Sequence, residues 1–367
     1  MADTSVSYKC PNCGAPLTFQ PGKKTVTCEY CGTEFEIAAI EEMFRAKEQL
    51  AARAQEAREA KWDTENAGDE WTDEEAAALK AFTCSSCGAE IVCDENTMAT
   101  ECVYCGNPTM IPKRFDGALK PDLIIPFKKT KEDAVNALKE FYKGRWLLPS
   151  NFTANNRVEA IQPMYVPFWL FDSKVDAQAE FRAAKIRIYD TPDAVVTEKS
   201  VYSCQRAGKM QFMKIPADGS KKMNDEFMDS IEPFDYNELV DFSTAYLTGY
   251  LADKYDVSAD DCTERVNIRM ENSAVAVLQN TVEGYDECTV EDKAVVKDIG
   301  KVLYAMVPVW ILTTRYNDKP YTFMMNGQTG KVVGSLPYDN FKSFLYPAIF
   351  TVILIPIIYF IMNMLME

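Results

Sequence analysis

The chain of 367 residues contains no histidine. This absence removes the commonest general base, the nucleophile pairs built on it and every imidazole metal ligand. The sequence also lacks a P-loop, a G-x-G-x-x-G dinucleotide motif, a G-x-S-x-G nucleophile motif and an EF-hand loop. We therefore predict that the protein is not an enzyme, and we assign it no catalytic residue, organic cofactor or small-molecule substrate.

Basic residues are scarce as well, with 39 lysines and arginines against 55 aspartates and glutamates, a net charge of −16. Binding to duplex nucleic acid requires lysine and arginine side chains that displace condensed counterions. Residues 1–37 carry only three lysines and four acidic residues, and no basic patch occurs in residues 81–112. The composition thus favours protein partners, with nucleic-acid binding as the alternative.

What the chain does have is a repeated cysteine framework. In both copies, two C-x-x-C pairs are separated by fourteen residues, and a glycine follows each pair. The first copy comprises Cys10, Cys13, Cys28 and Cys31, and the second comprises Cys84, Cys87, Cys102 and Cys105. This spacing turns four sulfurs toward one point, which is typical of a structural zinc ribbon. We predict two Zn²⁺ ions, each with four thiolate ligands and no open position, and short strands at residues 17–19 and 35–37.

Three other readings of the framework are iron, disulfide bonds and redox-active C-x-x-C pairs. Four thiolates also hold iron, and spacing alone does not distinguish the two metals. Disulfides suit a secreted chain, but the first eight residues have no apolar core of a signal peptide. The remaining four cysteines, Cys93, Cys204, Cys262 and Cys288, show no paired spacing, and we expect them to be small buried residues in a reducing compartment.

The rest of the chain divides into blocks of different composition. We assign residues 1–37 to the first ribbon and residues 38–80 to a charged helix followed by an acidic linker. Within that block, helical spacing covers residues 38–62, and residues 63–75 are typical of a flexible segment. The second ribbon occupies residues 81–112.

Residues 113–340 have the aromatic and β-branched content of a globular domain. We predict a strand at 122–127, a helix at 131–146, a helix capped by Ser258 and a three-stranded meander over residues 313–333. Two segments share the pattern V-P-x-W, at Val166 and Val307, and their prolines suggest that each begins a strand. The fold class is α+β with a mainly antiparallel sheet.

A long apolar run closes the sequence. Residues 343–366 contain no charged side chain. As a helix they reach ~36 Å, which is enough to cross a hydrocarbon core of ~30 Å. We predict a transmembrane tail anchor, with Lys331 and Lys342 on its amino-terminal side. The protein is then expected in the cytoplasmic membrane as a single-pass protein whose folded domains face the cytoplasm.

Several long phrases carry a resemblance to a known family. They include K-P-D-L-I-I-P-F from Lys120, Y-V-P-F-W-L-F-D from Tyr165, A-Y-L-T-G-Y-L-A-D-K-Y-D-V from Ala245 and N-G-Q-T-G-K-V-V-G from Asn326. With the two C-x-x-C-G frameworks and the apolar tail, the chain resembles bacterial double zinc-ribbon membrane proteins, described as containing a transcription factor IIB-type zinc ribbon. All eight ligand positions match.

That resemblance implies a function. Some members are encoded beside homologues of phage shock protein A and flotillin-like proteins. The resemblance therefore implies a membrane adaptor in envelope-stress response, with those proteins as partners. It also implies an alternative, a membrane-tethered nucleic-acid-binding regulator of the transcription factor IIB type, which the acidity of the chain argues against.

Overall fold

The computed structural model describes residues 8–20, 22–59, 61–94, 96–99, 101–115, 118–155, 160–223, 225–317 and 319–366. The chain forms two compact units, each made of three separate stretches of sequence. Unit 1 comprises Met1–Asn66, Leu170–Ala217 and Asp260–Val302, and unit 2 comprises Ala67–Trp169, Asp218–Ala259 and Leu303–Glu367.

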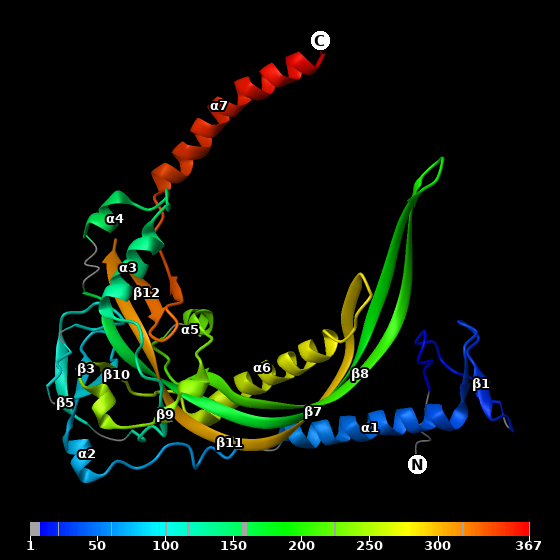
Figure 1. The fold of residues 1–367 in the computed structure, drawn as a ribbon, viewed down its shortest axis with the longest axis horizontal. Helices are drawn as coiled ribbons and strands as arrows, with labels where there is room; N and C mark the ends of the chain where they lie inside the picture. Colours follow the sequence, from blue (N-terminus) through cyan, green and yellow to red (C-terminus); the bar gives the residue numbers. More distant parts are fainter. Residues whose placement is uncertain are drawn as a thin grey trace. The chain divides into compact units, whose positions relative to one another are not determined.

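Unit 1 contains the first cysteine-rich segment, parts of two long strands and nearly all of a third. Apart from the long strands, it contains β1 (Thr25–Thr27), β2 (Glu34–Glu36), α1 (Ile37–Glu59) and most of α6 (Ala259–Gln279). The long strands are β7 (Gln162–Asp190), β8 (Val195–Asp218) and β11 (Glu287–Tyr316). Strand β8 pairs with β7, and α1 and α6 run along opposite sides of these strands (Figure 1).

Alternation along β7 determines what each face of the strand contacts. Odd-numbered side chains such as Ala177 and Phe181 are fully buried. The even-numbered ones from Asp172 to Arg182 are polar, and the Glu180 carboxylate forms an ion pair at 3.0 Å with Lys47 of α1. Since successive side chains of a strand point to opposite faces, α1 lies on the polar face and α6 on the apolar one.

The main sheet follows the order β13-β12-β11-β7-β10-β4-β3-β5, and β6 pairs with both β11 and β9. Its remaining strands are β3 (Leu79–Cys84), β4 (Glu90–Asp94), β5 (Met110–Arg114), β6 (Leu123–Ile124), β9 (Val240–Asp241), β10 (Leu251–Asp253), β12 (Lys319–Asn326) and β13 (Val332–Gly334). The helices of unit 2 are α2 (Asp73–Ala77), α3 (Lys131–Tyr142), α4 (Ser150–Asn155), α5 (Asp225–Ile231) and α7 (Asn340–Met366), with 3₁₀ turns at Tyr236–Glu238 and Thr244–Leu247. Pairings are mostly antiparallel, with parallel exceptions at β7–β10 and β6–β11. The predicted α+β class is confirmed.

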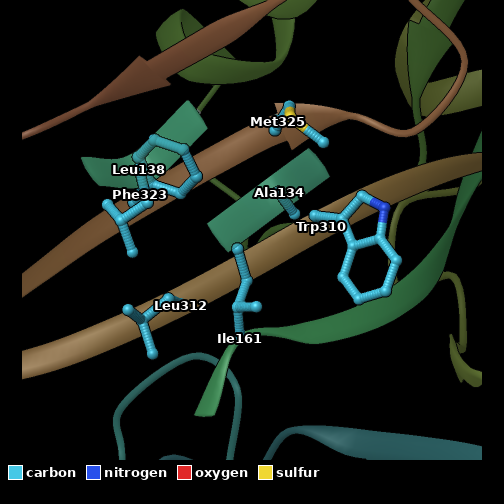
Figure 2. Packing of buried hydrophobic residues seen from close by; sticks show 7 residues of the cluster. All are labelled: Ala134, Leu138, Ile161, Trp310, Leu312, Phe323 and Met325. Atoms are coloured by element: carbon cyan, nitrogen blue, oxygen red, sulfur yellow. The ribbon is translucent and has the colours of Figure 1, made fainter. Parts of the chain in front are cut away.

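The core of unit 2 forms where α3 covers the meander. Figure 2 shows Ala134 and Leu138 of α3 packed with Trp310 and Leu312 of β11 and with side chains of β12. The Trp310 indole N–H donates to the Lys129 carbonyl at 2.9 Å, so this buried ring keeps its hydrogen bond. Helix α3 starts at a capping box between Thr130 and Asp133. It ends four residues before the predicted Trp146, because Gly144 turns the chain with φ of +73°.

The predicted meander is confirmed, since β11 pairs with β12 and β12 with β13, all antiparallel. The expectation that the second V-P-x-W segment begins a strand is wrong. Pro308 lies deep inside β11. Strand β6 pairs with Ala305 and Met306, and β12 pairs from Val309 onward. The proline therefore falls in the gap between two partners, where its missing N–H leaves no ladder bond unmade.

The acidic stretch after α1 is also not a flexible linker over its second half. The backbone N–H of Gly68 donates to Asp122 Oδ2 at 2.9 Å, and Asp69 and Lys120 exchange two backbone hydrogen bonds. Trp71 packs edge-on against Phe115 and Phe242. The segment is therefore held to unit 2. The glycine and the aromatic ring that interrupt its run of acidic residues make these contacts.

Candidate metal centres

The structure brings the four cysteines of the first copy together. The Sγ atoms of Cys10 and Cys31 lie 3.7 Å apart, and those of Cys13 and Cys28 lie 3.5 Å apart. A tetrahedral metal with metal–sulfur bonds of ~2.3 Å places its sulfurs ~3.8 Å from one another. The group therefore has the dimensions of a four-thiolate metal site, and all four sulfurs lie within 4.8 Å of each other.

The second group has the same geometry. Cys84 and Cys105 bring their Sγ atoms to 3.6 Å, as do Cys87 and Cys102. These sulfurs too lie within 4.8 Å of one another. A disulfide bond needs ~2.05 Å between sulfurs, so each set is arranged for a metal rather than for paired oxidation.

The local sequence makes these knuckles because each C-x-x-C-G turn closes on itself. The N–H of Gly14 donates to the Cys10 carbonyl at 2.8 Å, and the N–H of Gly88 donates to the Cys84 carbonyl at 3.0 Å. Both glycines, like their counterparts Gly32 and Gly106, have φ between 66° and 73°. Such values strain any residue with a Cβ, which explains the glycine after every pair.

Hydrogen bonds around the sulfurs stabilise the charged thiolate. The Thr33 hydroxyl and backbone N–H lower the pKa of Cys31 to about 6. Burial raises the pKa of Cys84, but hydrogen bonds from the backbone N–H groups of Cys87 and Ser86 outweigh this effect and bring the pKa down to about 6. Each group thus contains one thiol whose charged form is stabilised, whereas the pKa values of neighbouring thiols such as Cys13 and Cys102 are raised.

Two asparagines that the sequence analysis missed contribute to these sites. Asn12 Nδ2 lies 3.8 Å from Cys31 Sγ, and Asn107 Nδ2 lies 3.7 Å from Cys84 Sγ. Each side chain crosses from one knuckle to the sulfur of the other. They occupy different positions in the two copies, so the repeat itself could not reveal them. Polar residues beside C-x-x-C pairs were the available signal.

The two sites differ in their surroundings. The second is fixed to unit 2 at its backbone: Lys222 Nζ donates to the Cys87 carbonyl at 2.9 Å, and Arg315 Nε donates to the Cys105 carbonyl at 3.0 Å. Its strands β3 and β4 continue the main sheet through β10. The first site is held by a small apolar cluster of its own that includes Leu17, Val26 and Ile40. Leu17 is buried there without forming the predicted strand.

A tyrosine at matching positions shows the same difference. Tyr30 and Tyr104 both precede the last cysteine of their group. The hydroxyl of Tyr104 is buried beside Asp253 of β10, and burial together with that carboxylate raises its pKa. Tyr30 is 76% exposed. The knuckle of the second group therefore docks on this chain, whereas that of the first presents its aromatic ring to solvent.

The other four cysteines stand apart from both groups. Cys93, Cys204 and Cys262 are buried, and Cys288 is half-buried. Burial raises the pKa of Cys93 to about 11, as expected of an inert core thiol.

Helix α7 is the only described helix long and apolar enough to cross a membrane, with a candidate span of Asn340–Asn363 and a mean hydropathy of 2.4. The two four-cysteine groups, the mixed sheet and this helix define an α+β protein with two candidate metal centres and one potential membrane span. No protein-family profile matches the chain, and no solved structure matches it.

The chain is 34% identical over 337 residues to a Bacillus subtilis (strain 168) protein described as uncharacterized protein YdjG. The match covers 92% of each sequence. The chain belongs to the family of this protein. That description assigns no activity, so the function must be argued from the sites.

Proposed function

We propose that the protein is a membrane-anchored zinc-ribbon adaptor whose folded units recruit protein partners to the cytoplasmic face of the membrane. The observation that carries this proposal is the contrast between two equal metal centres, one packed into the fold and the other exposed. A ribbon that served only to stabilise the fold would be expected to pack into it. The second ribbon does so, whereas the first does not.

Zinc is the metal that the donor set favours. Four thiolates in a tetrahedron, with no open position, are the usual ligand set of structural zinc. Such an ion holds the knuckles in shape and takes part in no reaction. We call residues 8–37 ribbon 1. It would hold the more exposed of the two zinc ions, since Cys13 and Cys31 are exposed.

Tyr30 is the side chain best placed to contact a partner. Aromatic residues dominate binding energy at interfaces because they bury a large area with few rotatable bonds. Tyr104 supplies an example within this chain of the surface that such a knuckle fits, a socket with a buried carboxyl and a hydroxyl group. We infer that the partner of ribbon 1 offers a comparable socket.

Helix α7 supports the anchor part of the proposal. Lys331 precedes α7 and Lys342 lies in its first turn, and these positive charges favour a cytoplasmic location for the units that precede the span. Reducing conditions there keep thiolates free for metal. Confinement to a membrane raises the local concentration of binding sites, so that individually weak contacts suffice.

The resemblance described above suggests which partners to test. Homologues of phage shock protein A and flotillin-like proteins are the candidates, and envelope stress is the matching context. The net charge of −16 opposes the alternative role in nucleic-acid binding.

The test compares Tyr30→Ala with Tyr202→Ala, a matched control on β8, in full-length protein crosslinked in intact cells. We expect the wild type and the control to crosslink to a phage shock protein A homologue or a flotillin-like protein, and Tyr30→Ala to lose most of that yield while retaining two zinc ions. Equal yields from both variants would exclude ribbon 1 as the contact. Recovery of the full-length chain in the soluble fraction after alkaline washing would exclude the anchor.

A further inference from the structure

The first turn of α7 is tied to the loop that follows α3. The backbone N–H of Asp339 donates to the Leu147 carbonyl at 2.8 Å. Lys342 Nζ donates to the Leu148 carbonyl at 2.8 Å and lies 3.4 Å from Ser150 Oγ at the start of α4. Figure 1 shows α4 beside the base of α7. We call residues 143–148 the base loop.

These hydrogen bonds fix the depth of the base loop relative to a membrane. Charged residues cease at Lys342, and residues 343–366 contain none. If α7 spans the bilayer, the hydrocarbon boundary lies within about one turn of Ser343, a rise of ~5 Å. The headgroup region is itself ~5–8 Å deep. A loop hydrogen-bonded to Asp339 and Lys342 must therefore lie among the lipid headgroups.

The side chains of the base loop suit that location. Trp146 is 68% exposed and Leu147 is 41% exposed. The other four tryptophans, Trp62, Trp71, Trp169 and Trp310, are buried or half-buried. An exposed tryptophan is costly in water, whereas the amphipathic indole is favoured at the membrane interface. Tyr338, next to Asp339, is 70% exposed and adds a second interfacial ring.

The charge of the surface around the base loop and the first turn of α7 also differs from that of the whole chain. Lys139, Lys143, Arg145 and Lys342 are accompanied by only two acidic residues, Glu140 and Asp339. One of these acids, Glu140, pairs with Lys143 at 3.1 Å. Arg145 lies over the Phe141 ring at 5.2 Å, which holds the guanidinium group at the surface. An acidic protein thus has a basic surface at the point where it would enter the membrane.

We propose that the base loop and the first turn of α7 form a lipid-headgroup site, in which Trp146 inserts at the interface while Arg145 and Lys342 bind the phosphate groups of anionic lipids. This inference rests on the proposed membrane anchor. It adds that unit 2 is held against the bilayer surface and does not swing freely on its helix.

The insertion of Trp146 is tested with full-length protein in lipid nanodiscs that contain lipids spin-labelled at acyl carbon 5 or 12. We expect the shallow label to quench tryptophan fluorescence more than the deep label. Most of this quenching should disappear in Trp146→Phe and remain in the control Trp71→Phe. Unchanged quenching in Trp146→Phe would overturn the proposal. Because α7 insertion is checked separately by alkaline extraction, failure of the anchor and failure of the base loop are distinguished.

The lipid specificity is tested by placing the shallow label on either an anionic phosphatidylglycerol or a zwitterionic phosphatidylcholine at equal mole fraction. We expect at least about two-fold stronger quenching of Trp146 by the anionic lipid, since each basic residue near the surface favours it. The excess should fall in Arg145→Glu and vanish in high salt, but it should remain in Lys61→Glu. Equal quenching by both lipids in the wild type would overturn the headgroup assignment.

Discussion

At the scale of the residue, several small or polar residues occupy positions where close packing leaves no room for a different side chain. Gly327 lies in the turn between β12 and β13, and a Cβ there would stand 2.7 Å from the Phe127 ring and 2.9 Å from Pro308. The Phe127 ring cannot move away easily because it stacks on Tyr250 at 4.6 Å. Asn326, fully buried beside it, donates to the Ile231 carbonyl at 3.0 Å.

We expect Gly327→Ala to lower the free energy of unfolding by about 1–3 kcal/mol, through overpacking against two rigid rings. The measurement is denaturant unfolding of full-length protein in detergent. Gly208→Ala serves as the control, since its Cβ would meet Leu278 at 3.5 Å, an ordinary contact. Equal effects of the two substitutions would show that the Phe127 contact is not tight in solution.

Asp253 provides a prediction for pH. Burial raises the pKa of this carboxyl to about 7, against the opposing effect of the Ser220 and Tyr104 hydroxyls. In the unfolded chain the group ionises near pH 4, so the folded state holds the extra proton between about pH 4 and pH 7. The stability from this proton is complete below about pH 4 and is lost as the pH rises through 7.

Between about pH 5.5 and pH 8, the wild type should therefore lose about 2 kcal/mol of unfolding free energy relative to Asp253→Asn, which cannot ionise. Denaturant titrations of both proteins at fixed ionic strength measure this difference. Contributions from the metal sites are common to both and cancel. Parallel pH profiles would contradict the assignment of a neutral carboxyl in the folded state.

At the scale of the element, the two ribbons show how one sequence pattern serves two structural settings. Both have a pair of glycine-closed knuckles with nearly the same distances between sulfurs. The strands of the second ribbon join the main sheet, with β4 paired to β10, whereas β1 and β2 of the first pair only with each other. The cysteine spacing determines the metal site but carries no information about the sheet beyond it.

Loss of each metal should consequently have effects of different extent. We expect Cys28→Ser to remove hydrogen-exchange protection from residues 8–37 alone. Cys102→Ser should reduce protection in β3, β4, β5 and β10 as well and lower the melting temperature of unit 2. Cys288→Ser, which alters no ligand, is the control. If Cys28→Ser destabilised unit 2 as strongly, ribbon 1 would be part of the same cooperative structure.

At the scale of the whole molecule, the sequence was informative where the pattern is local. The cysteine repeat, helix α1, the meander and the apolar helix are all confirmed because spacing and turn residues determine them over short stretches. The great length of β7 and β11 was not predictable. Pro167, Gly300 and Pro308 would ordinarily interrupt a strand, yet each is accommodated by its neighbours. A Cβ at Gly300 would fall 2.1 Å from the Asp172 carbonyl oxygen, so the close approach of two strands requires glycine there.

Helix α6 gives a similar lesson. Helical spacing puts Cys262, Val266, Met270, Ala274 and Val277 on one face, and the first four are buried, but Val277 is 48% exposed and Val275 is buried instead. The period of 3.6 residues predicts the buried face of this helix well in its middle and less well at its last turn. Contacts between distant segments, such as Tyr104 with Asp253, carry no local signature and needed the structure.

Both β7 and β11 belong to unit 2 at one end and to unit 1 at the other. Neither unit can therefore be exchanged between genes as a cassette, because the unit boundaries after Trp169 and after Val302 fall inside these two strands. Descendants of an ancestral protein with this arrangement would have to inherit both units together, which agrees with a relative that matches along 92% of its length.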